Sequence, residues 1–186
     1  MRQAEGNTGP GGGAAGGTAA APAVLVDSSD YRRAIARFAT GVTIVTTQVD
    51  GLDVAMTVNS LTSVSLNPLL VLFCADKSAR FHGSVLRTGL WAVSVLGVGD
   101  ESASRWFATR GRPDEARLGD YPTSPGPQTG LPLLDSGIAF LECRTWATHD
   151  AGDHTVVIGE VLAVDSPVER QPPLLYFESR YGVLRD

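Results

Sequence analysis

Cysteine is scarce in this chain of 186 residues, and acidic residues outnumber basic ones. The two cysteines, Cys74 and Cys143, each lie inside an apolar segment, which excludes a disulfide-stapled scaffold and a multi-cysteine zinc ribbon. Fifteen lysines and arginines face 20 aspartates and glutamates, so the net charge is −5 and the clustered positive charge that nucleic acids require is missing. No apolar run approaches the roughly 18–20 residues that span a bilayer. We therefore expect a cytoplasmic protein that binds neither nucleic acid nor membrane.

The first 26 residues are rich in glycine, alanine and proline and contain almost no aromatic or branched apolar residues before Val24. Such a segment cannot bury enough surface to offset its chain entropy, so we expect a disordered tail over 1–26. It lacks the patterns of a signal or transit peptide. Hydrophobic residues make up 43% of the chain, which is enough for one folded domain over 27–186.

Three short helices are expected, over about 28–38, 78–87 and 100–109. Cap-type residues precede the first and third, and Gly89 follows the second. Apolar residues spaced one helical turn apart, or adjacent on one face, are expected to point inward in the first and third helices. These residues are Tyr31, Ile35, Phe38, Trp106 and Phe107.

Strand patterns dominate the rest of the chain. Val42–Thr47 alternates apolar and threonine residues, and Asp50-Gly51 is a hairpin turn signal that returns the chain over 52–58. The continuous apolar run Leu69–Cys74 predicts a strand buried on both faces, and 111–137 is rich in proline and glycine and predicts a surface loop. Further strands are expected over 90–96, 138–148 and 155–164. Short turns between them favour a mainly β fold, an antiparallel sheet closed into a barrel, over a doubly wound α/β fold.

A candidate anion site lies where the expected strand over 69–74 meets the helix over 78–87. The N–H groups at a helix N-terminus attract anions, and Lys77, Ser78 and Arg80 add donors that suit a phosphate. The alternative is that Ser78 caps the helix while Lys77 and Arg80 are solvated.

Two further clusters invite a functional interpretation. The polar segment 56–65 could hydrogen-bond a ring system, or it could satisfy its own backbone in turns. The turn from His149 to His154 lacks metal-ligand spacing, so we expect no metal there. His154 instead either begins a strand or faces a cleft as a hydrogen-bond donor or proton source. Neither a G-x-S-x-G elbow nor a P-loop pattern occurs.

Several segments together carry a resemblance to a known family. They are YRRAIARFATGVTIVTT (31–47), MTVNSLTSVSLNP (56–68), LLVLFCAD (69–76), GDH (152–154) with VVIGEV (156–161), and PLLYF (173–177) with Tyr181-Gly182. Their order and spacing resemble the flavin-reductase-like family, the small NAD(P)H:flavin oxidoreductases of two-component monooxygenases. The resemblance runs from about residue 31 to the C-terminus.

The resemblance implies an antiparallel, Greek-key split β-barrel of the FMN-binding type, normally a homodimer. It implies that NADH or NADPH reduces FMN or FAD, and that free reduced flavin passes to a partner oxygenase or halogenase. His154 is implied to be the catalytic residue that contacts the nicotinamide nucleotide, with three neighbours. These are Gly152, Asp153 and Tyr181. The implied flavin-binding residues are Met56, Thr57, Val58, Asn59, Ser60, Thr62, Ser63, Ser65, Cys74, Ala75, Asp76, Lys77, Ser78, Arg80 and Ser94.

The chain departs from the family pattern at two positions. Ser94 stands where asparagine is common, which removes an amide from the flavin side, and Glu178 stands where arginine is common, which bears on the choice between NADH and NADPH. Two other functions would share the same binding residues: a flavoprotein that keeps its flavin for its own redox chemistry, and a non-catalytic flavin-binding module.

Overall fold

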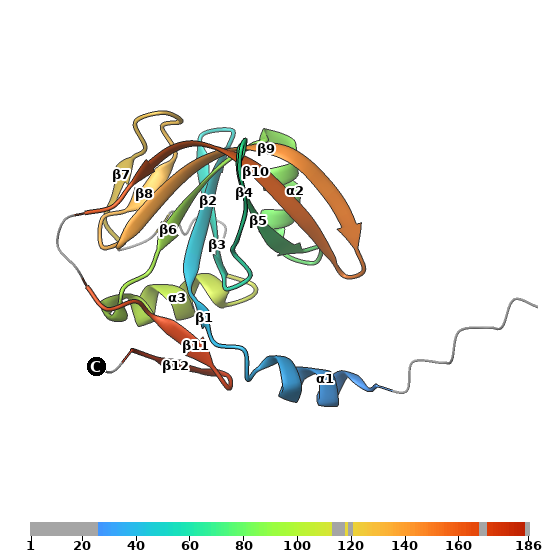
Figure 1. The fold of residues 1–186 in the computed structure, drawn as a ribbon. Coiled ribbons are helices and arrows are strands. Elements are labelled where there is room, and N and C mark those ends of the chain that lie inside the picture. The colour runs from blue at the N-terminus through green and yellow to red at the C-terminus, as the bar shows by residue number, and fades with distance from the viewer. Residues whose placement is uncertain (1–25, 113–117, 119–120, 168–170, 185–186) are drawn as a thin grey trace, which may run out of the picture.

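The computed structural model describes residues 26–112, 118, 121–167 and 171–184, and it is built mainly of antiparallel β-strands (Figure 1). The tail expected over 1–26 lies outside these residues except for Val26. The helices are α1 (Ser28–Ile35), α2 (Arg80–Thr88) and α3 (Glu101–Ala108), with a 3₁₀ turn η1 (Val98–Asp100). In the described parts no helix is long and apolar enough to cross a membrane. The strands are β1 (Thr40–Gly41), β2 (Thr43–Val49), β3 (Leu52–Val58), β4 (Thr62–Leu66), β5 (Leu69–Asp76), β6 (Leu90–Val95), β7 (Thr123–Pro125), β8 (Pro132–Leu134), β9 (Ala139–Ala151), β10 (His154–Asp165), β11 (Leu175–Phe177) and β12 (Arg180–Gly182).

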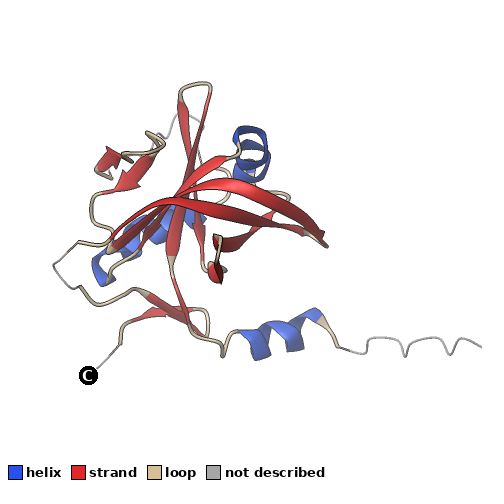
Figure 2. Ribbon diagram, turned by 45° about the horizontal axis from the view of Figure 1, so that its top comes forward, coloured by secondary structure: helices blue, strands red, loops and turns tan. Residues whose placement is uncertain are grey.

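One seven-stranded sheet forms the body, in the order β3-β2-β6-β9-β10-β5-β4. Every neighbouring pair is antiparallel, which confirms the expected fold class. The sheet curls strongly (Figure 2), but its edge strands β3 and β4 do not pair with each other among the described residues. The barrel is therefore split rather than closed, because the connection over 59–61 joins β3 to β4 without a hydrogen-bonded hairpin.

The β2–β3 hairpin confirms the turn signal in the sequence. Asp50 and Gly51 have φ of 53° and 77°, the left-handed values that a tight two-residue turn requires and that Asp-Gly adopts readily. Strand β3 then runs over Leu52–Val58, as expected.

Strand β5 differs from its prediction, because only one of its faces is fully buried. Val71, Phe73 and Ala75 are buried, whereas the alternate residues, such as Cys74 and Asp76, are half-buried. A strand directs successive side chains to opposite faces, and the core covers only one of these faces. The other face is available to form a cavity.

Helix α1 also differs from its prediction. It ends at Ile35 instead of near Phe38, and the apolar side chains of the segment are exposed: Tyr31 by 61%, Ile35 by 49% and Phe38 by 70%. The helix projects away from the body beside β11 (Figure 1), so no described element of the chain covers this face. In α3, Phe107 is buried as expected, but Trp106 remains 37% exposed.

The segment expected to be a surface loop contains a small sheet. Strands β7 and β8 pair, and β8 is buried against the main sheet. Thr46 donates to the carbonyl oxygen of Pro132 at 2.7 Å, and the backbone N–H of Leu134 donates to Ser94 Oγ at 3.0 Å. These polar residues of the main sheet hold β8, which local composition did not reveal.

The core beneath α2 is centred on an aromatic contact. Phe73 meets Trp91 edge-on at 4.9 Å between ring centroids, and both side chains are fully buried. The Trp91 ring also covers Gly159, which lies at a β-bulge in β10. A β-carbon at this glycine would overlap the indole, so the position requires a residue without a side chain.

We expect Gly159→Ala to destabilise the fold by about 1–3 kcal/mol, because the added methyl group would displace Trp91 from a close-packed core. Chemical denaturation followed by tryptophan fluorescence would measure the change. Gly83→Ala is the matched control: nothing lies near its β-carbon, and alanine in α2 is expected to stabilise by about 0.5–1 kcal/mol. Equal effects of the two substitutions would contradict the packing role of Gly159.

Candidate functional site

A cavity of about 550 Å³ lies between the end of β3, the end of β5, the start of α2 and the segment that follows α3. These elements come from distant parts of the chain, and they gather ten of the residues singled out from the sequence. The ten are Met56, Thr57, Val58, Asn59, Ser60, Cys74, Asp76, Ser78, Arg80 and His154.

Hydroxyl groups hold the wall that β3 contributes. Thr57 Oγ1 donates to the backbone oxygen of Ser104 in α3 at 2.6 Å, and the N–H of Cys74 donates to Ser60 Oγ at 3.0 Å. Both hydroxyls thus satisfy the protein's own backbone, as one interpretation of the segment 56–65 expected. The same bonds fix the distance from β3 to α3 and to β5, so they shape the cavity.

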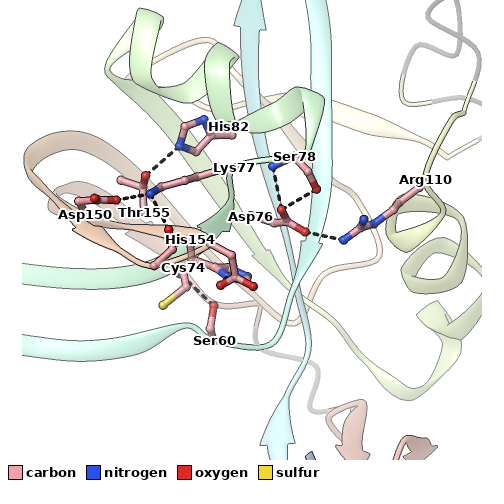
Figure 3. Close-up of polar contacts among 12 residues, drawn as sticks. Ser60, Cys74, Asp76, Lys77, Ser78, His82, Arg110, Asp150, His154 and Thr155 are labelled. Carbon is pink, nitrogen blue, oxygen red and sulfur yellow. Dashed lines mark hydrogen bonds and ion pairs between the residues drawn. The ribbon is translucent and has the colours of Figure 1, made fainter. Parts of the chain in front are cut away.

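A tight turn connects β5 to α2 at one end of the cavity (Figure 3). Asp76 Oδ1 accepts from the N–H of Ser78 at 2.8 Å and from its Oγ at 2.7 Å. These bonds are the main reason why the pKa of Asp76 lies below its usual value, so the carboxylate is charged near neutral pH. Ser78 therefore does not cap α2. The N-cap is Ala79, which makes no side-chain cap hydrogen bond and lines the cavity.

Two arginines that the sequence analysis did not select also line the cavity. Arg110 contacts Asp76, with 2.5 Å between the guanidinium nitrogen and Oδ2. Arg112 donates to the carbonyl oxygen of Ala55 at 2.8 Å and lies over the ring of Phe107. Burial lowers the pKa of Arg112, and the positive charge of Arg80 lowers it further, so these two guanidinium groups lie near enough to repel each other.

No local motif marked these arginines, because they follow α3 in a segment rich in glycine and proline. The packing of Phe107 into the core helps to bring Arg110 and Arg112 to the cavity. The sequence feature that could have pointed to them is a pair of arginines on either side of a glycine, directly after a helix with a buried face.

His154 reaches the cavity from the neighbouring strand. It is the first residue of β10 and lies directly opposite Asp76 in the β5–β10 register. Its Nδ1 shares a hydrogen bond of 2.7 Å with Asp153 Oδ1, which lowers the pKa of Asp153. The side chain of His154 is 40% exposed, so its ring is accessible to a ligand.

Lys77 lies outside the cavity, where it holds the β9–β10 hairpin (Figure 3). Its Nζ pairs with Asp150 and donates to the carbonyl oxygen of Gly152 at 2.6 Å. Its backbone N–H donates to the oxygen of Asp153 at 3.0 Å. Both contacts fix the turn that carries His154, so Lys77 has a positioning role in this structure.

The remaining selected residues do not line the cavity. Three lie on the edge strand β4, two are fully or nearly buried, and the others lie in turns or near the C-terminus. They are Thr62, Ser63, Ser65, Ala75, Ser94, Gly152, Asp153 and Tyr181. Glu178, the second departure from the family pattern, also lies outside the cavity and pairs with Arg37 at 3.3 Å. Within the described parts of the chain, no group of three or more histidine, cysteine or acidic residues is arranged to hold a metal.

Comparisons with known proteins agree on one family. The model of the flavin reductase like domain matches residues 35–185. An NADH-dependent FAD reductase from Streptomyces globisporus is 43% identical over 77% of this chain and 80% of its own length. The reductase subunit HsaB of a flavin-dependent monooxygenase from Rhodococcus jostii is 35% identical over 89% of this chain and 82% of its own. The structure of BorF, the flavin reductase component of a bacterial two-component tryptophan halogenase, superposes with a TM-score of 0.80 at 39% identity, covering 86% of this chain and 99% of that one.

The two cysteines provide a test of the cavity. Cys74 lines it and is half-buried, whereas Cys143 is fully buried, and burial raises the pKa of its thiol to about 12. We expect iodoacetamide at pH 8 to modify Cys74 alone in the native protein, and saturating FAD to slow that reaction. Mass spectrometry of the labelled peptides would measure both rates. Labelling of Cys143 only after unfolding is the control. An unchanged labelling rate of Cys74 under saturating FAD would contradict the placement of Cys74 in the ligand-binding cavity.

Proposed function

We propose, because this chain belongs to the flavin reductase like family, that it uses NADH to reduce free FMN or FAD and supplies the reduced flavin to a separate oxygenase or halogenase. The observation that carries the proposal is the cavity itself. It joins a polar strand end, a helix N-terminus and three arginines at one place, the features that a phosphorylated ring compound requires.

The residues of the cavity fit a flavin. Backbone and side-chain groups over 56–60, with Cys74, would lie along the ring and its ribityl chain. Ser78 and Arg80, at the start of α2, would bind the phosphate through charge-assisted hydrogen bonds. When bound, the flavin supplies the hydride-accepting ring, so the protein needs no nucleophile of its own.

His154 would contact the nicotinamide nucleotide. Its ring borders the cavity, and the carboxylate of Asp153 accepts a hydrogen bond from Nδ1, so among the described residues Nε2 remains available for a ligand. Tyr181 would act indirectly. Its hydroxyl bonds to Ser104 Oγ at 2.7 Å, and the backbone oxygen of Ser104 accepts from Thr57 in the cavity wall.

We also propose that the protein is a homodimer. The apolar side chains of Tyr31, Ile35 and Phe38 are exposed on the projecting α1 segment, and Leu66 on the edge strand β4 is 84% exposed. Exposed apolar groups gathered on a projecting segment and on a strand edge favour burial against a second copy. A cytoplasmic location stays a prediction.

The dimer can be tested by light scattering. We expect a mass twice the 19.5 kDa of one chain, and we expect Phe38→Asp to shift the protein toward the monomer because it buries a charge in the interface. Leu52→Asp, at an exposed apolar residue in the β2–β3 hairpin, is the control that should remain dimeric. A monomeric unmodified protein would contradict the proposal.

The activity itself is tested by NADH oxidation after exhaustive dialysis, with FMN, FAD or no flavin added. We expect oxidation that saturates with free flavin. His154→Ala should raise the KM for NADH about two- to tenfold, the loss of one hydrogen bond, with little change in the Kd for FAD. Oxidation without added flavin would instead favour a flavoprotein that keeps its cofactor, and binding without turnover would favour a non-catalytic module.

A further inference from the structure

Positive charge is concentrated at one end of the cavity, although the whole chain has a net charge of −5. Arg80 approaches from the first turn of α2, and Arg110 and Arg112 approach from the segment after α3. Among the described residues that line this cavity, Asp76 is the one carboxylate. Among these described residues the guanidinium groups outnumber the carboxylate, which favours a ligand with an anionic group.

Arg112 has a structural role. Its guanidinium spans from the oxygen of Thr109, at 3.2 Å, to the oxygen of Ala55 in β3, at 2.8 Å, and it lies over Phe107. These bonds tie the segment after α3 to the sheet. They place Arg110, two residues earlier, at the mouth of the cavity.

Arg110 is held much less firmly. The side chain of Arg110 is 80% exposed and that of Asp76 is 25% exposed, so solvent reaches their ion pair and weakens its contribution to stability. Asp76 does not depend on this pair, because Ser78 already donates two hydrogen bonds to Oδ1. The Ser78 bonds also lower the pKa of Asp76 more than the charge of Arg110 does. Arg110 can therefore leave Asp76 without leaving an unsatisfied carboxylate.

We propose that Arg110 is a phosphate-binding residue of the flavin site that exchanges its partner, from Asp76 in the free protein to the flavin phosphate in the complex. The inference rests on the proposed flavin reductase function. In the free protein, Asp76 neutralises Arg110 and restrains it beside Ser78 and Arg80. A phosphate entering between them offers Arg110 a more highly charged acceptor with several oxygens.

The competing interpretation is that the Arg110–Asp76 pair only ties the segment after α3 to β5. In that case removing Arg110 would affect every flavin alike, through the shape of the cavity. If Arg110 binds phosphate, its removal should weaken the binding of phosphorylated flavins and leave riboflavin binding unchanged. Riboflavin, FMN and FAD, which carry no, one and two phosphates, separate the two interpretations.

The first experiment measures the Kd of these three flavins by isothermal titration calorimetry for Arg110→Ala. We expect FMN and FAD to bind about 10- to 100-fold more weakly, the loss of a hydrogen bond between charged groups, while the Kd for riboflavin changes by less than about twofold. A larger loss for FAD than for FMN places Arg110 at the second phosphate, and equal losses place it at the phosphate that both share. Equal weakening of all three flavins, or of none, would overturn the proposal.

Two controls accompany this variant. Arg87→Ala removes an exposed arginine of α2 that pairs with Asp50 at 3.2 Å and lies outside the cavity. This variant should change the Kd of none of the three flavins. Arg80→Ala should also weaken FMN and FAD selectively, since it lies at the helix N-terminus. If the unmodified protein binds no flavin, the proposed function fails, whereas normal binding with an unaffected Arg110→Ala variant refutes this inference alone.

The second experiment tests the exchange of partners. Asp76→Asn keeps an Oδ1 that accepts from Ser78 but removes the charge that holds Arg110. We expect FMN and FAD to bind about two- to fivefold more tightly in this variant, since the ion pair no longer competes. The gain should be smaller when Arg110→Ala is already present. The same gain in both backgrounds, or weaker binding by Asp76→Asn, would show that Asp76 does not compete for Arg110.

Discussion

The pairing of β5 with β10, which in turn pairs with β9, is the constraint on which the rest of the site depends. This antiparallel ladder places His154 opposite Asp76, so residues 78 positions apart in the chain meet at one end of a cavity. A shift of the register by one residue would exchange the faces of β5, placing Cys74 and Asp76 in the core and Phe73 and Ala75 in the cavity. The close approach of the Trp91 indole to Gly159 fixes which residue of β10 lies beneath the indole, because a β-carbon at this position would overlap the ring.

Charge is distributed very unevenly over this acidic protein. Among the residues that the structure describes, the cavity brings three arginines together around one well-satisfied carboxylate, while most of the other ion pairs lie in exposed positions elsewhere. Both flavin phosphates and nicotinamide nucleotides are anions, so a local positive field in a negative protein would direct them to the cavity. The overall composition, which argues against nucleic acid, is therefore compatible with a strongly anion-selective site.

The parts of this structure that could be predicted from the sequence are those that local chemistry determines. Asp50-Gly51 specifies a tight turn by its backbone conformation, and Gly89 ends α2 in a left-handed conformation, as expected from its position. The strand-to-helix junction at Asp76–Arg80 was also predictable from residue types, and the anion site there stays a prediction. Whether a whole face of a strand or helix is buried or exposed could not be predicted from local chemistry. Neither the open face of β5 nor the exposed face of α1 differs in composition from a buried one.

Residues that act through tertiary contacts were the hardest to assign. Lys77 has the chemistry of a phosphate ligand, but its ammonium group lies nearer to the oxygens of the β9–β10 hairpin and binds these. Ser94 has the chemistry of a flavin ligand, but the arrival of β8 makes it an acceptor for Leu134. Arg110 carried no local signal at all. In each case the partner comes from a segment far away in the sequence, whose position depends on the complete fold.

The split between β3 and β4 has a mechanical consequence. The cavity wall runs from β3, at one edge of a continuous sheet, to β5, next to the other edge. The covalent connection over 59–61 and the bond from Cys74 to Ser60 set the spacing of these two walls from within the protein. The width of the cavity is therefore set before a ligand arrives, so ligand binding does not have to supply free energy to form it. A cavity whose width is set in this way suits a ligand that is bound and then released.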